Sequence, residues 1–312
     1  MNERAPLVLF VYNRPDHTKK TLEEVNKCAW SDQTELFIFA DGSKNEKSIK
    51  AVEETRKIVD EFEKNNHFKR VIVKKSEKNN GLKKSVISGA TEILKQYGKI
   101  IVLEDDLLVS EDFLVFMNGA LDYYEKESKI WSIAGYTPDL KSLRNYDKDV
   151  YMIERGGSWG WATWYDRWKT IDWNASDYKE FKADKNRVKA FRKIGYNLPE
   201  MLDAQMNGLI DSWAVLFTYE KFKQGRYTVN PAISRIKNIG NDGSGVHSRA
   251  EKRWDVTLNE GVAPISFISP QLDKKVNREY YHYYAGNILI RNAKRLRQKF
   301  KIANHKAMVL NN

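Results

Sequence analysis

Three consecutive carboxylates, Glu104, Asp105 and Asp106, directly follow a predicted strand at residues 99–103. Adjacent negative charges repel one another, so the stability of the fold does not favour this acidic run. Acidic residues are also common in the first turn of a helix, where they complement the macrodipole. Here residues 107–109 continue the apolar pattern, which places the run at the end of a strand. Oxygen ligands gathered at one point are what Mg2+ or Mn2+ requires when it also holds a diphosphate, so the run predicts a divalent-metal site.

Polar residues also follow two other predicted strands. Asn13 and Arg14 come after the strand at 7–12, and Asp41 comes after the strand at 35–40, in an Asp-Gly turn. Each has an ordinary interpretation, as turn chemistry or as a solvated surface residue. Ligands of parallel sheets bind beyond the carboxyl ends of the strands, where these clusters and the acidic run converge. An Asp can accept a hydrogen bond from a pyrimidine or ribose, and an Arg can clamp a base carbonyl or a phosphate.

A tight turn at residues 79–81 precedes a predicted helix at 83–97, whose first turn carries Lys84. A helix N-terminus with nearby lysines is a ready anion site. The glycine spacing and the Gly-Lys-Ser/Thr ending of a P-loop are missing, which disfavours an ATPase or GTPase.

Two further candidates lie in the second half of the chain. Asp211 is bordered by apolar residues, so we expect poor hydration and a raised pKa that would suit a general base. A helix cap or an ion pair with a lysine or arginine is an equally good interpretation. His247 stands in a glycine-rich loop and could reach a metal or phosphate, although a lone loop histidine is more often merely exposed. The sequence contains neither a cluster of His and Cys for zinc nor a Gly-x-Ser-x-Gly elbow.

Strand and helix signals alternate through the first 110 residues, which predicts a parallel, doubly wound sheet. After residue 112 the pattern is mixed. We expect helices at 113–127, 177–195, 198–224 and 280–301, strands at 130–135 and 226–233, and loops at 156–164 and 238–248.

The composition is that of a globular α/β protein: 312 residues, 41% hydrophobic, with a net charge of +11. The excess of basic residues is compatible with binding to nucleic acid, to an anionic membrane or to a phosphorylated ligand. With Cys28 as the single cysteine, disulfides within the chain are excluded, and a reducing compartment is the natural setting. We expect no signal peptide and no membrane span, hence a cytoplasmic protein. Contact with the inner membrane face is an alternative that rests on the basic tail: Arg291, Lys294, Arg295, Arg297, Lys299 and Lys301.

The order Asn-Arg, Asp-Gly and Glu-Asp-Asp after the first, second and fourth strands resembles GT-A glycosyltransferases. More narrowly, it is similar to the inverting Golgi N-acetylglucosaminyltransferase that starts complex N-glycans, and to bacterial relatives in polysaccharide assembly. The similarity runs over residues 7–248, and residues 102–107 are its most specific part. It implies an α/β, GT-A (Rossmann-like) fold with a mostly parallel central sheet. We expect a catalytic domain at 1–250, with a nucleotide-binding half at 1–110 and an acceptor-binding half at 111–250, and a C-terminal extension with a basic helix at 251–312.

The resemblance also implies roles. Asp106 would bind Mn2+ or Mg2+, and Asp211 would be the general base, although Ser212 replaces the second carboxylate of the family's Asp-Asp-Trp segment. The predicted donor-binding residues are Asn13, Arg14, Asp41, Lys84, Glu104, Asp105, Trp161 and His247.

The predicted function is an inverting transfer of a sugar from a UDP-sugar to a saccharide or lipid-linked oligosaccharide, in cell-surface or capsular polysaccharide assembly. A metal-dependent nucleotidyltransferase is an alternative, but it would usually carry a glycine-rich phosphate loop after the first strand. A basic nucleic-acid-binding protein is another, but the acidic run repels phosphate unless a metal is bound. We therefore expect no nucleic-acid partner.

Overall fold

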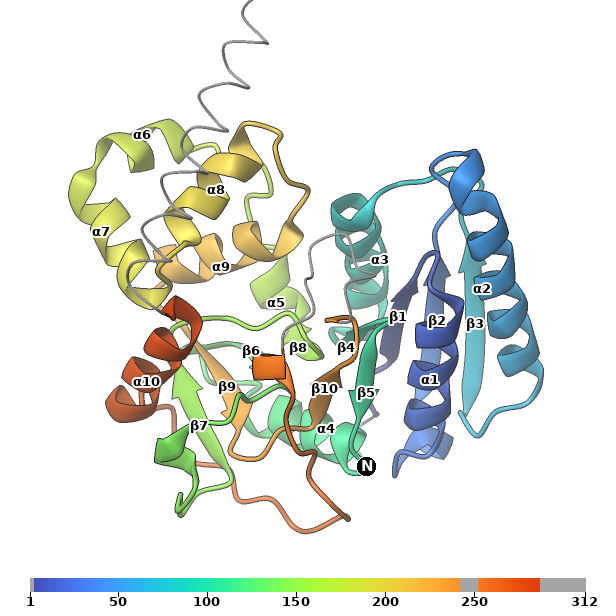
Figure 1. Cartoon of the computed structure of the whole chain (residues 1–312). Coiled ribbons are helices and arrows are strands. Elements are labelled where there is room, and N and C mark those ends of the chain that lie inside the picture. The colour runs from blue at the N-terminus through green and yellow to red at the C-terminus, as the bar shows by residue number, and fades with distance from the viewer. Residues whose placement is uncertain (1–2, 242–251, 287–312) are drawn as a thin grey trace, which may run out of the picture.

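The computed structural model describes residues 3–241 and 252–286, and an eight-stranded sheet forms the centre of this part of the chain (Figure 1). Its strand order is β3-β2-β1-β4-β8-β6-β9-β7. The strands are β1 (Leu7–Val11), β2 (Glu35–Ala40), β3 (Arg70–Lys75), β4 (Lys99–Glu104), β6 (Ile130–Ala134), β7 (Val150–Ile153), β8 (Trp161–Trp164) and β9 (Tyr227–Pro231). Strands β1 to β4 are mutually parallel and β6 is parallel to β9, whereas β8 and β7 run antiparallel to their neighbours. The prediction of a mostly parallel central sheet is confirmed.

Helices cover both faces of this sheet. They are α1 (Pro15–Asn26), α2 (Glu46–Lys64), α3 (Leu82–Tyr97), α4 (Phe113–Tyr123), α5 (Tyr165–Trp168), α6 (Tyr178–Ala183), α7 (Lys185–Ile194), α8 (Leu198–Met206), α9 (Trp213–Lys223) and α10 (Lys274–Ala285). Short 3-10 turns form at Ser31–Gln33, Lys141–Leu143 and Lys252–Trp254.

Strand β1 shows why two helical layers are needed. All five of its residues are buried. Leu7, Leu9 and Val11 pack into one apolar cluster with α1, α2 and α4, and Val8 and Phe10 pack into another with α3, α5 and α9. Because successive side chains of a strand point to opposite faces, a continuously apolar strand requires cover on both sides. The result is a three-layer α/β/α arrangement.

The second half departs from the prediction in several places. The expected helix at 177–195 is two helices, because α6 ends at Ala183 and Asp184 caps the start of α7. Part of the expected loop at 156–164 is the strand β8, which pairs with both β4 and β6. Four residues after Gly160 are a weak strand signal alone, and the two neighbouring strands supply the hydrogen bonds that stabilise them. The expected helix at 198–224 is two helices, because Gly208 adopts a left-handed φ of 71° after α8 and Ser212 caps α9. Helices α6 to α9 enclose an apolar cluster of their own beside α3 (Figure 1).

A small second sheet lies over the carboxyl edge of β4. Its strands β5 (Leu107–Val109) and β10 (Ile236–Asn238) are antiparallel. Next to this pair, Arg235 and Asp112 form a buried ion pair with a distance of 3.1 Å between Nη2 and Oδ2. Ser110 and Asn259 donate further hydrogen bonds to the Asp112 carboxylate. These contacts fix the β5–β10 pair next to the acidic run.

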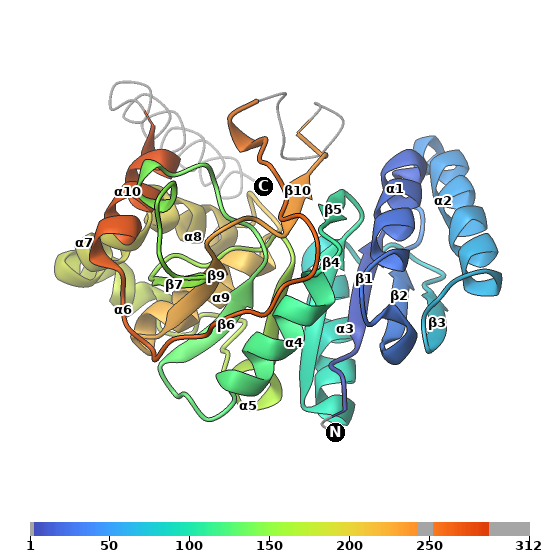
Figure 2. The ribbon, with the colours of Figure 1, turned by 90° about the horizontal axis from the view of Figure 1, so that it is seen from below.

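The described part of the predicted C-terminal extension packs against the same core as the first 250 residues. The segment between the 3-10 turn at Lys252–Trp254 and α10 crosses α4 (Figure 2), where the Phe267 ring lies 6.2 Å from that of Phe116. Helix α10 begins earlier than expected, at Lys274, and packs on β7 through Val276 and Tyr280. Within residues 3–241 and 252–286, no helix is both long and apolar enough to cross a membrane. The predicted helix beyond residue 286 lies outside the described residues.

Candidate active site

The acidic run lies at the carboxyl end of β4, in the middle of the sheet. The backbone amide of Tyr12 donates to Asp105 Oδ2 at 3.3 Å, and Thr21 Oγ1 donates to the Asp105 carbonyl at 3.0 Å. Both donors come from the β1–α1 segment. The run is therefore anchored to the neighbouring strand, as expected for polar residues at one edge of a parallel sheet.

The environment of this run disfavours negative charge. Burial, followed by the charges of Asp106 and Asp105, raises the pKa of Glu104 to about 8, although a hydrogen bond from Trp213 acts in the opposite direction. Burial and the charge of Asp106 also raise the pKa of Asp105 to about 7, against the effect of Arg14. Each carboxylate is thus destabilised by its neighbours, and a cation placed among them would relieve the repulsion.

Arg14 and the segment after β10 contact the side chain of Asp106. Arg14 Nη1 lies 2.7 Å from Asp106 Oδ2, and the Ile239 amide donates to the Asp106 carbonyl at 2.9 Å. A Cβ added to Gly240 would lie 2.0 Å from Asp106 Oδ2. Only a residue without a side chain allows the backbone to approach this carboxylate so closely.

Asp41 is buried and binds the turn before α3. Its carboxylate accepts hydrogen bonds from the amides of Gly42, Asn80 and Gly81, with distances between 2.9 and 3.1 Å. The side-chain amide of Asn79 adds another at 3.1 Å. Asp41 therefore positions the start of α3 relative to β2, and its predicted contact with the donor stays a prediction.

Asp211 lies in the loop between α8 and α9, at the N-terminus of α3. Its Oδ2 accepts a hydrogen bond from the Lys83 amide at 3.3 Å, and Oδ1 lies 3.8 Å from Lys83 Nζ. The side chain is 54% exposed, so the expectation of a poorly hydrated carboxylate is wrong. The apolar neighbours in sequence turn inward while Asp211 turns to solvent, because the loop breaks the helical pattern there. Ser212, which stands where the family has a second carboxylate, caps α9 through Val215.

The other predicted site residues divide into three groups. Asn13 and Arg14 lie together at the end of β1, and Lys84 is exposed in the first turn of α3. Trp161 is fully buried and stacks on Trp168, with ring centroids 5.6 Å apart, so the prediction that it contacts the donor is corrected: it is a core residue. His247 lies outside the described residues.

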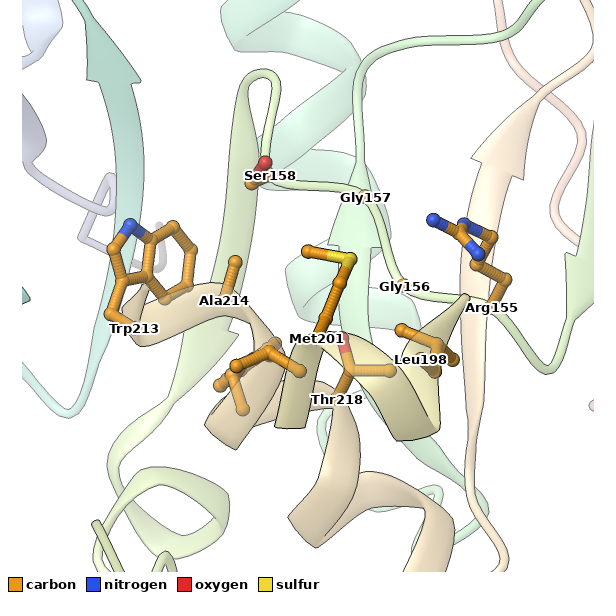
Figure 3. Close-up of a pocket in the computed structure, with 11 residues that line it drawn as sticks. Arg155, Gly156, Gly157, Ser158, Leu198, Met201, Trp213, Ala214 and Thr218 are labelled. Atoms are coloured by element: carbon orange, nitrogen blue, oxygen red, sulfur yellow. The ribbon is translucent and has the colours of Figure 1, made fainter. Parts of the chain in front are cut away.

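Trp213 is a site residue that the sequence reasoning missed. Its indole hydrogen-bonds Glu104, and its ring packs against Trp161 with centroids 4.9 Å apart. It also lines a cavity of about 110 Å3 between the loop at 155–158, α8 and α9 (Figure 3). A tryptophan in an apolar helical pattern indicates core, so no sequence signal marked this contact.

The carboxylates fit a metal ion that takes most of its ligands from a substrate. No three His, Cys, Asp or Glu side chains among residues 3–241 and 252–286 converge to enclose a metal by themselves. Asp106 offers a carboxylate at the sheet edge, and after burial its negative charge is the next cause of the raised pKa of Asp105 beside it. Such a donor set suits Mg2+ or Mn2+ bound through one or two carboxylates and a diphosphate.

The part of the chain that contains the acidic run matches a known protein family. Residues 7–139 match the family model of glycosyl transferase family 2. The matched stretch, which is less than half of the chain, is similar to a family 2 glycosyltransferase domain. It contains β1 to β4, Arg14, Asp41 and the acidic run, and with the sheet described above it gives the predicted GT-A fold. Asp211 and the cavity lie beyond the matched residues.

Two solved glycosyltransferase structures have a low similarity to this chain. The mannosyltransferase PcManGT from Pyrobaculum calidifontis, solved with GDP-Man and Mn2+, is 11% identical and has a TM-score of 0.39, over 70% of this chain and 74% of its own. The bifunctional glycosyltransferase WbbM, solved in its apo form, is 10% identical with a TM-score of 0.26, over 45% of this chain and 24% of its own. No curated protein matches the sequence. The narrower resemblance to the Golgi N-acetylglucosaminyltransferase stays a prediction.

Proposed function

We propose that the protein is an inverting, metal-dependent glycosyltransferase that moves a hexosyl or N-acetylhexosaminyl group from a UDP-sugar to a hydroxyl of a saccharide acceptor, in polysaccharide assembly. The observation that carries this proposal is the meeting of Arg14 with the three carboxylates at the carboxyl edge of β4. One cation that pairs with Asp106, next to two further acidic groups, suits a ligand that brings both a diphosphate and a divalent metal.

On the donor side, Asp106 would hold the metal, and Asn13, Arg14, Asp41, Lys84, Glu104 and Asp105 would bind the nucleotide and sugar. Bound there, Mn2+ or Mg2+ would neutralise the diphosphate and assist departure of the leaving group. Arg14 is held at Asp106 by its ion pair, so its guanidinium is already placed to exchange this carboxylate for a phosphate or base carbonyl.

On the acceptor side, Asp211 would take the proton of the attacking hydroxyl. It is exposed enough to meet an acceptor, and the Lys83 amide orients its carboxylate. Trp213 follows Asp211 by two residues and forms a hydrogen bond with Glu104. This bond brings the Asp211 loop close to the acidic run. A base on this side of the donor suits attack on the anomeric carbon from the face opposite the leaving group.

Calorimetry with a panel of nucleotide sugars, with and without Mn2+, tests this proposal. We expect metal-dependent binding of one UDP-sugar, and its loss in Asp106→Ala. Asp139→Ala is the matched control, because that aspartate is 68% exposed and, among the residues that the structure describes, forms an ion pair only with the surface residue Arg144 at 3.4 Å. Metal-dependent UDP binding that survives in Asp106→Ala would show that the site is assigned wrongly.

We also propose that the enzyme acts in the cytoplasm, at the inner membrane face, on a lipid-linked or other saccharide acceptor. The support is the basic sequence of residues 291–301, which lies outside the described residues. Co-sedimentation with vesicles of anionic lipid should depend on this segment. Equal sedimentation of the full chain and of a chain ending at residue 286 would exclude the membrane role of the tail.

A further inference from the structure

The cavity beside the acidic run has walls of two kinds. Leu198, Met201 and Val215 form an apolar side on α8 and α9, and the loop at 155–158 forms a polar side (Figure 3). None of the described residues that line it is acidic. Its volume of about 110 Å3 corresponds to roughly four water molecules, so it admits a substituent of a sugar and not an oligosaccharide.

Arg155 brings a positive charge to this cavity that no described carboxylate neutralises. Within residues 3–241 and 252–286, no Asp or Glu forms an ion pair with it. Its contacts are a 3.5 Å hydrogen bond from Nη1 to Asn197 Oδ1 and the Tyr284 ring, 4.5 Å from the guanidinium. The adjacent Glu154 accepts a hydrogen bond from Asn277 Nδ2 at 2.9 Å.

A second basic side chain lies behind the polar wall. Lys221 is fully buried and donates from Nζ to Thr228 Oγ1 at 2.9 Å. A Cβ added to Gly156, which lines the cavity, would lie 3.6 Å from this Nζ. The opposite wall contains the first turn of α9, whose dipole adds positive potential. A space that has the Arg155 guanidinium on one side, the N-terminus of α9 on another and no acidic residue in its described lining favours an anion.

We propose that this cavity binds an anionic substituent of the acceptor saccharide, a carboxylate or a phosphate, and that Arg155 contacts it directly. The inference rests on the proposed function, because it is the transfer reaction that makes this an acceptor site. Trp213 connects the cavity to the acidic run, because its ring lines the cavity and its indole forms a hydrogen bond with Glu104. An acceptor anchored here would therefore sit one side chain away from the donor, and Arg155 would select acidic acceptors over neutral ones.

Titration of the full chain with glucose, glucuronate and glucose 6-phosphate, followed by ligand-observed NMR, tests the inference without any donor. We expect one or both acids to bind about ten-fold more tightly than glucose. The two acids separate a carboxylate from a phosphate as the preferred group. Arg155→Met should remove the preference and Arg155→Lys should keep part of it. Arg144→Met, at an exposed arginine on the surface turn, should behave as the wild type.

A second variant addresses the cavity without altering a charge. Gly156→Ala adds a methyl group 3.4 Å from Thr218 Oγ1 and 3.6 Å from Lys221 Nζ, which is ordinary contact, so the fold should tolerate it. It should weaken binding of the preferred acid several-fold by filling the space. Equal binding of acids and glucose by the wild type, or a preference that persists in both Arg155→Met and Gly156→Ala, would overturn the inference.

Parallel titration with UDP and Mn2+ separates this inference from the proposed function. Loss of the acid preference in Arg155→Met with UDP affinity unchanged supports a distinct acceptor subsite. A wild-type protein that prefers the acids but does not bind UDP would overturn the proposed function and leave the anion cavity supported.

Discussion

Two regions on either side of Trp213 carry opposite charge. At the carboxyl edge of β4 three carboxylates crowd together, and backbone and side-chain donors from β1 and α1 hold them in place. The cavity at α8 and α9 is lined by Arg155, with Lys221 behind its wall, and both of these basic side chains have only neutral hydrogen-bond partners among the described residues. The first region suits a metal and a diphosphate, and the second suits an anion. Each region concentrates one sign of charge, which costs folding free energy that a ligand of the opposite sign would recover.

Asp211 precedes Trp213 by two residues and contacts Lys83 at the start of α3, and its removal should have the largest effect. Asp211→Asn should lower kcat by roughly 10²–10⁴-fold because the acceptor hydroxyl loses its base, with donor affinity unchanged. Single-turnover kinetics with the donor identified by calorimetry would measure this. The exposed Asp139→Asn is the control. Unchanged turnover would remove Asp211 as the base and leave the two regions without a catalytic link.

The rigidity of the acidic edge depends on the buried pair of Arg235 and Asp112. Arg235→Met leaves the Asp112 side chain, which is 1% exposed, without its cation, so we expect a loss of about 3–5 kcal/mol in the free energy of unfolding. Arg144→Met removes an exposed pair and should cost less than about 1 kcal/mol. Urea denaturation compares the two variants. Similar losses would mean that the β5–β10 pair is not held by this ion pair.

The acidic edge should make the protein less stable as the pH rises. Unfolded Glu104 loses its proton near its ordinary pKa of 4.5, whereas the folded protein retains it up to about pH 8. The unfolded state therefore binds fewer protons in this window, and stability falls with rising pH by at most about 1.4 kcal/mol per unit. Without divalent metal, Glu104→Gln should flatten this fall in urea denaturation series. Glu54→Gln, at an exposed residue of α2, should not. The prediction is wrong if the free energy of unfolding falls equally with rising pH in the wild type and in Glu104→Gln.

The cationic region should show the opposite slope. Burial lowers the pKa of Lys221 from 10.5 to about 7. Between these values the unfolded state binds more protons than the folded state, so stability rises with pH, again by at most about 1.4 kcal/mol per unit. Lys221→Met should reduce this rise, and Lys50→Met, at a lysine that is 89% exposed, should leave it intact. A rise of equal size in both variants would mean that Lys221 is charged in the folded protein.

The local pattern of residues was enough to predict the acidic region. A buried strand, a turn and a helix are encoded within neighbouring residues, so Asp41, Arg14 and the acidic run could be assigned to one sheet edge in advance. Helix α2 also begins at a local signal, because Asn45 and Ser48 form a capping box there. The partners of these residues could not be predicted: Asp41 bonds the turn at 79–81, and Arg14 pairs with Asp106, because such contacts join segments far apart in the chain.

The sequence by itself thus determined the order of the elements, the GT-A type of sheet and the chemical nature of its carboxyl edge. Only the tertiary structure decided which aromatic residue is core and which is site: Trp161 is enclosed by β4, β6 and α9, while Trp213 reaches Glu104. It also decided that Asp211 is exposed and that Lys221 lies behind the cavity wall that Arg155 and Gly156 line. The physical reason is the range of the interactions. Strand and helix propensities act over a few residues, whereas burial and the electrostatic environment of a side chain depend on segments that only folding brings together.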